Sequence, residues 1–145
     1  MNMNLQVIKL FFRAIAGATA ILLAGAAMSA GHSVKVNLSG ANEVPPVTTA
    51  ATGAGMITVG DDMSVGGSVT TTGVDGVAAH IHTGATGMNG PVTIGLAKSA
   101  DNSWSVPPGA KFTDEQYKTF KAGGMYVNVH SAANKGGEIR GQIVP

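Results

Sequence analysis

The sequence predicts an all-β domain of the Greek-key sandwich or barrel class, with about seven or eight strands and one short connector helix. Valine, isoleucine and threonine recur in short runs, and these β-branched residues favour strands. Glycine, 21 of 145 residues, recurs between these runs and marks turns. Charged residues make up 12% of the chain, about half the usual share. Many short strands separated by turns are typical of sandwiches and barrels.

Alternation of apolar and polar residues places the strands. The first strand alternates cleanly, and the irregular connection after it contains Pro45 and Pro46, neither of which can donate to a ladder. Turn residues such as Asp75-Gly76 separate the later strands, and the last two form a hairpin around residues 134–137. The predicted strands cover residues 34–38, 55–59, 64–72, 77–82, 91–97, 103–106, 125–130 and 138–144.

One short helix is predicted after residue 113. Thr113 is a favourable N-cap residue, and Gln116 three positions later completes a capping box. Phe112 and Tyr117 have the spacing of a hydrophobic staple, and Gly123-Gly124 ends the helix. We expect this helix to connect two strands and to close one end of the core.

Residues 1–30 have the pattern of a secretory signal peptide. Lys9 and Arg13 give a positive start, and residues 14–27 form an uncharged stretch shorter than the roughly 20 residues of a membrane span. Small residues precede Gly31. The sequence therefore predicts a mature domain at 31–145 that is secreted or periplasmic, with no membrane span after leader removal. The alternative is an N-terminal membrane anchor.

Composition excludes several function classes. The chain has no cysteine, which removes disulfides, thiolate metal sites, iron–sulfur clusters and cysteine nucleophiles. Its net charge is +1, with no basic run, so it has no electrostatic footprint for nucleic acid. Ser131 directly follows His130, but adjacent strand residues point to opposite sides, so they form no nucleophile–base pair. No catalytic residue is assigned.

Three histidines lie on two predicted strands, on the faces turned away from the core. In the first strand, Val77, Ala79 and Ile81 share the predicted core face, so His80 and His82 lie opposite, about 6–7 Å apart by strand rise. The same alternation applies to the second strand. There Met125, Val127 and Val129 are expected in the core, and Tyr126, Asn128 and His130 outside it.

If these strands are neighbours, three imidazoles converge into a metal site. Imidazole suits copper, zinc, nickel and iron, and three protein ligands leave one position for water or substrate. Glu138 begins the return strand beside His130, as a fourth ligand or as an acceptor for an imidazole N–H. The alternative is that the histidines are structural and bond to the loops. His32 is separate: cleavage after Ser29 would expose an amino-terminal tripeptide ending at His32 that binds copper(II).

Three ordered motifs resemble the CHRD domain, the module first described in chordin. They are residues 38–47 (LSGANEVPPV), residues 79–84 with 87–92 (AHIHTG and GMNGPV), and residues 126–131 with 134–143 (YVNVHS and NKGGEIRGQI). The resemblance covers nearly all of 31–145. It implies a secreted protein with an immunoglobulin-like β-barrel, and the family's biochemical role is poorly defined.

A second likeness is to the copper site of copper/zinc superoxide dismutases, which are also Greek-key barrels. It implies that His80, His82 and His130 are copper ligands and that Arg140 lies near the open site. The bridging histidine, the histidine-rich zinc loop and the disulfide cysteines of that family are missing. The leading hypothesis is therefore an exported metal-binding protein, with copper first and zinc second. The alternatives are an interaction module with a protein partner and a reduced dismutase-like redox enzyme.

Overall fold

The computed structural model describes residues 30–145. Apart from Ala30, the proposed leader lies outside the described residues. Within residues 30–145, no helix has the length and apolar character needed to cross a membrane.

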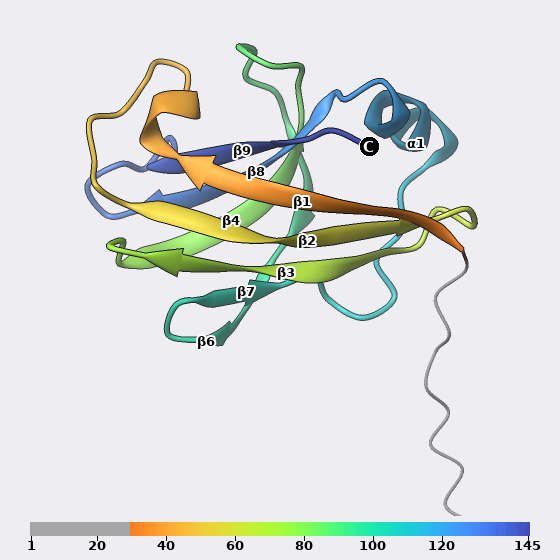
Figure 1. The fold of residues 1–145 in the computed structure, drawn as a ribbon, viewed down its shortest axis with the longest axis horizontal. Helices are drawn as coiled ribbons and strands as arrows, with labels where there is room; N and C mark the ends of the chain where they lie inside the picture. Colours follow the sequence, from red (N-terminus) through yellow and green to blue (C-terminus); the bar gives the residue numbers. More distant parts are fainter. Residues whose placement is uncertain (1–29) are drawn as a thin grey trace, which may run out of the picture.

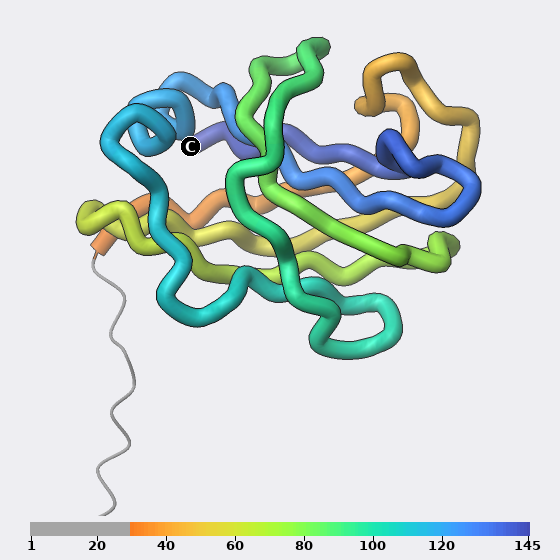
Figure 2. Tube along the Cα trace, turned by 180° about the vertical axis from the view of Figure 1, so that it is seen from behind, coloured from red at the N-terminus to blue at the C-terminus, as the bar shows by residue number. Residues whose placement is uncertain are grey.

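Nine antiparallel strands form one sheet in the order β5-β4-β8-β9-β1-β2-β3-β7-β6. The outermost strands, β5 and β6, are consecutive in the chain, so the sheet curls around one core and nearly closes (Figures 1 and 2). The predicted all-β sandwich or barrel is confirmed. The elements are β1 (Gly31–Ser39), η1 (Gly40–Asn42), β2 (Thr52–Gly60), β3 (Val65–Thr72), β4 (Gly76–Thr83), β5 (Val92–Gly95), β6 (Ala97–Ala100), β7 (Ser103–Ser105), α1 (Asp114–Lys121), β8 (Met125–Ser131) and β9 (Ile139–Ile143).

The strand count exceeds the prediction because residues 91–97 form two strands where one was expected. β5 pairs with β4, whereas β6 pairs with β7. The change of partner occurs at Leu96, which is 9% exposed and donates its backbone N–H to Ala79. This buried leucine is where the chain passes from one end of the sheet to the other.

The core follows the predicted alternation in most strands. Val34, Val36 and Leu38 of β1 are buried, as are Met125, Val127 and Val129 of β8. Each such side chain contributes roughly 1.5–3 kcal/mol when fully buried.

Val77 is the exception, and its prediction was wrong. It is 61% exposed, whereas Ala79 and Ile81 are buried as expected. The register between β4 and β8 shifts between Gly76 and Ala78, so Val77 is the extra residue of a bulge. A bulge interrupts the period of two and turns the extra side chain away from the core.

The predicted helix and its cap are confirmed. The Thr113 hydroxyl accepts from the Gln116 backbone at 3.2 Å, and the Gln116 side chain accepts from the Thr113 backbone at 2.9 Å. At the other end Gly123 has a φ of +73°, and Gly123 and Gly124 donate to Phe120 and Thr119, which is a Schellman motif. Phe120 is fully buried, so the helix packs against the core as expected.

Over β8 the sheet face opposite the core is covered, although the alternation predicted an outer face. Tyr126 and Asn128 of β8 are 3% and 2% exposed. The η1 connection and the loop at 84–91 rise together at one end of the barrel (Figures 1 and 2). Asn89 of the second loop donates to the Val44 carbonyl of the first at 2.7 Å. Strand periodicity separates two faces but does not show that loops cover one of them.

Candidate metal centre

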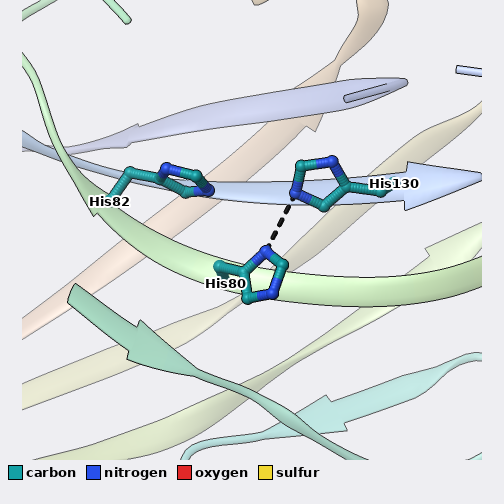
Figure 3. A group of neighbouring side chains, drawn as sticks. All are labelled: His80, His82 and His130. Carbon is teal, nitrogen blue, oxygen red and sulfur yellow. Dashed lines mark hydrogen bonds between the residues drawn. The ribbon is translucent and has the colours of Figure 1, made fainter. Parts of the chain in front are cut away.

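His80, His82 and His130 converge on one point, on the face of the sheet opposite the core. β4 carries the first two residues, and β8, its neighbour in the sheet, carries the third. One ring nitrogen of each histidine lies within 4.8 Å of the others. Figure 3 shows the three rings close together, with a hydrogen bond joining His80 Nδ1 and His130 Nε2 at 3.0 Å. These strands are therefore neighbours, which was the condition for the three imidazoles to converge.

Backbone carbonyls set the tautomers of two of the rings. Nδ1 of His82 lies 3.0 Å from the Gly90 carbonyl, and Nδ1 of His130 lies 2.9 Å from the Lys135 carbonyl. A carbonyl oxygen only accepts, so both Nδ1 atoms carry the proton and both Nε2 atoms carry a lone pair. Metal-binding histidines in proteins commonly donate their other ring N–H in this way.

Nε2 of His82 is buried and has no hydrogen-bond partner among residues 30–145. Its side chain is 8% exposed, so water does not readily satisfy it. A buried polar atom without a partner carries a free-energy cost, and such atoms are uncommon in folded proteins. A cation bound at this lone pair would satisfy it.

The ring nitrogens that join His80 and His130 lie nearly as far apart as two ligands bound to one metal ion. Because His130 donates through Nδ1, its Nε2 accepts the proton of His80 Nδ1. Two nitrogens bound to zinc at roughly 2.0–2.1 Å with a tetrahedral angle lie about 3.3 Å apart. A cation could replace the shared proton with little movement of the rings.

Burial and the neighbouring imidazoles favour the neutral, metal-binding form of His80 and His82. The pKa of His80 is lowered, first by burial and then by the neighbouring His130 and His82. Burial also lowers the pKa of His82, against the opposing effect of its bond to Gly90. His80 and His130 are half-buried, so the cluster retains access to solvent.

Tyr126 supports His82 from the neighbouring strand. Its ring is nearly parallel to the imidazole, at 7° and 4.9 Å between centroids, and its hydroxyl accepts from the Gly90 backbone at 3.2 Å. The Arg140 guanidinium lies 3.5 Å from the Tyr126 ring. Since β4 and β9 flank β8 on opposite sides, Tyr126 stands between His82 and Arg140.

The sequence pattern did not indicate that a buried polar group lies beside the histidines. Asn128, which pairs with Arg140 of β9, donates to the Glu43 carboxyl from the first covering loop. Glu43 is 5% exposed, and burial raises its pKa to about 7, although the Asn128 bond and the Arg140 charge act in the opposite direction. In the sequence, the feature that could have pointed to Glu43 is its position in the motif at residues 38–47.

The structure does not bring Glu138 or His32 into the cluster. The Glu138 carboxylate accepts from Thr49 at 2.8 Å, and its bonding to Ser131 is the main cause of its lowered pKa. The Glu138 side chain therefore links the β8–β9 hairpin to the first covering loop by a hydrogen bond. His32 lies on an exposed part of β1, where its ring meets the edge of Phe120.

A family model described as the CHRD domain matches residues 34–143. The chain belongs to the CHRD-domain family. The matched region contains all three clustered histidines, Glu43 and Arg140, and the resemblance noted in the sequence is thereby confirmed. Comparisons with curated proteins and with solved structures gave no match.

Proposed function

We propose that this CHRD-domain protein binds one transition-metal ion through His80, His82 and His130. The observation that carries the proposal is the buried Nε2 of His82, which has no hydrogen-bond partner in the described part of the chain and lies beside two further ring nitrogens. The protein would act as a carrier or buffer for the ion, or as part of a metal-handling system.

Copper is the first candidate metal and zinc the second. The donor set is imidazole alone, because the chain contains no cysteine, and imidazole suits both ions. At a given nitrogen site copper(II) binds more tightly than zinc(II). The order of the histidines in the sequence, similar to that of copper/zinc superoxide dismutases, also favours copper.

Export of the protein is part of the proposal. CHRD domains are of a typically extracellular type. The charged start, uncharged stretch and small residues of 1–30 support a cleaved leader, with a mature domain at 31–145 in the periplasm or outside the cell.

Calorimetric titration with copper(II) and zinc(II) tests the proposal. We expect one ion per chain and a similar, strong loss of affinity in His80→Ala, His82→Ala and His130→Ala, because two imidazoles make a poor site. If His130→Ala binds both ions as tightly as the wild type, the two strands do not form one site. The interaction-module alternative would then lead.

His32→Ala is the matched control. A mature chain beginning at Ala30 would offer copper(II) its amino terminus, two backbone amides and His32 as a second site. His32→Ala removes that site and leaves the cluster intact. Zinc titration of His32→Ala should therefore match the wild type.

A further inference from the structure

A cavity of about 250 Å³ lies under the two covering loops, and β9 forms part of its wall. Asn42 and Glu43 of the first loop, residues 86–87 of the second, and Arg140 and Gln142 of β9 line it. One water occupies about 30 Å³ in the liquid, so the cavity has room for a small organic molecule. None of the three clustered histidines lines it.

Arg140 brings an unpaired positive charge to this cavity. It is 1% exposed, and no carboxylate lies within 4.0 Å of it; the ion pair found in residues 30–145 joins Lys111 and Asp62 instead. Its guanidinium donates to three neutral acceptors, the side chains of Asn89 and Gln142 and the Ala85 carbonyl. A guanidinium has five N–H groups, and a buried charge is normally paired.

Glu43 does not fully supply the missing negative charge. With its pKa raised to about 7 by burial, the carboxyl is protonated in about half of the molecules at neutral pH and in most below it. The charged side chains near it are Arg140 and Lys135, the latter lining an adjoining hollow with Glu43. In its protonated form Glu43 offers an O–H donor to a bound anion.

We propose that this cavity binds a small organic carboxylate, which pairs with the Arg140 guanidinium and accepts a hydrogen bond from Glu43. Arginine matches a carboxylate in shape as well as charge, because two of its N–H groups can bond both oxygens. The apolar side chains of Ala41 and Val44 in the lining suit a short hydrocarbon remainder. The site is independent of the metal-binding proposal.

Propionate and its uncharged analogue propionamide test the proposal on the wild-type protein. We expect saturable binding of propionate by ligand-observed NMR and a concentration-dependent rise in Tm, with neither effect from propionamide. Equal responses to the two compounds, or no response to propionate at tens of millimolar, would overturn the proposal. This comparison needs no variant to fold.

The pH dependence identifies the role of Glu43. Between pH 6 and 8 the protonated fraction of a group with a pKa of about 7 falls about tenfold, so propionate affinity should fall about tenfold. In Glu43→Gln this dependence should disappear. An unchanged dependence in that variant would exclude Glu43 as the donor. Lys111→Gln, which removes a cation elsewhere, should behave as the wild type.

A second pair of probes, N-acetyl-alanyl-alanine and its C-terminal amide, distinguishes a peptide C-terminus from a free acid as the source of the carboxylate. Binding of the peptide acid with at least tenfold higher affinity than propionate would assign the site to a chain terminus. Tighter binding of propionate would assign it to a free acid. Arg140→Lys keeps the charge but loses the two-point geometry, and should weaken either acid at least tenfold.

Discussion

The imidazole of His82 and the phenol of Tyr126 lie in nearly parallel planes, 7° apart, with their centroids separated by 4.9 Å. The two side chains also share Gly90, whose carbonyl accepts from His82 and whose N–H donates to the tyrosine hydroxyl. A side chain at Gly90 would place its Cβ 1.7 Å from the Thr83 carbonyl. Tyr126 and Gly90 together therefore fix the orientation and tautomer of His82.

Tyr126→Phe should weaken metal binding while leaving the ring stack in place. The change removes the acceptor of the Gly90 N–H, so the carbonyl that orients His82 is held less firmly. Loss of such a supporting contact typically costs 10–100-fold in metal affinity, and we expect about tenfold here. Zinc titration of the variant measures it.

Tyr117→Phe is the matched control, because the chain has two tyrosines and Tyr117 lies on α1. It should bind zinc as the wild type does. If Tyr126→Phe also binds zinc with wild-type affinity, the hydroxyl does not position His82.

Glu43→Gln should change how stability depends on pH. The folded-state pKa of Glu43, about 7, is above its ordinary value of 4.5. Its contribution is therefore fully present below pH 4.5 and is lost as the pH rises through 7. Relative to the wild type, the variant should gain stability between pH 5 and pH 8, measured by urea denaturation.

Glu115→Gln, at an exposed position, is the control for the urea denaturation at pH 5 and pH 8. A difference between Glu43→Gln and the wild type that is the same at both pH values would show that Glu43 is ionised in the folded protein throughout this range.

Much of the fold and the three histidines of the cluster were predictable from the sequence, whereas Glu138, also predicted there, lies outside the cluster. The period of two in β8 separates Val127 and Val129 from His130 without any knowledge of neighbours. The capping residues of α1 act locally, so Thr113 and Gln116 are readable in the chain. Predictions failed where the outcome depends on contacts distant in sequence.

The covering of the histidine face is one such outcome. Glu43 and Asn128 are 85 residues apart, and their contact depends on how a proline-containing connection folds back over β8. The position of the Glu138 side chain likewise depends on its hydrogen bond with Thr49, which lies in the same connection. Alternation indicates which side of a strand a residue occupies, but not what a loop brings to that side.

Thr113→Ala should destabilise the protein by about 1 kcal/mol, because it removes the side-chain acceptor at the N-terminus of α1. Gln116→Ala should cost less, since the cap hydroxyl remains. Chemical denaturation of both variants measures these costs. Lys118→Ala, at an exposed position of the same helix, should change stability less than Thr113→Ala does, because alanine has the higher helix propensity and only a weak charge interaction near the helix C-terminus is lost. An unchanged midpoint in Thr113→Ala would mean that the cap contributes nothing.

The exported protein should begin close to residue 31. Lys9, Arg13 and the uncharged stretch after them are the basis for this expectation. The intact mass of the protein recovered outside the cytoplasm measures the start. A mass that retains Lys9 and Arg13 would instead support the membrane-anchor alternative.

Acid should weaken both the metal-free fold and the metal site, with the two effects distinguishable. The pKa values of His80 and His82 are lowered in the folded state, so the stability they contribute is present above about 6.5 and is lost as the pH falls below it. Glu43 acts in the opposite direction, so the histidine contribution is measured as a difference between the wild type and His82→Ala. The metal-free wild type should lose more stability between pH 7.5 and 5 than this variant does.

At pH 7.5, zinc at a hundred times its Kd should stabilise the wild type by about 2.7 kcal/mol, and at pH 5 the same concentration should stabilise it much less, because the ligands must lose protons to bind. Thermal unfolding with and without zinc measures both effects. Equal zinc stabilisation at the two pH values would mean that the ion is held by groups other than these imidazoles.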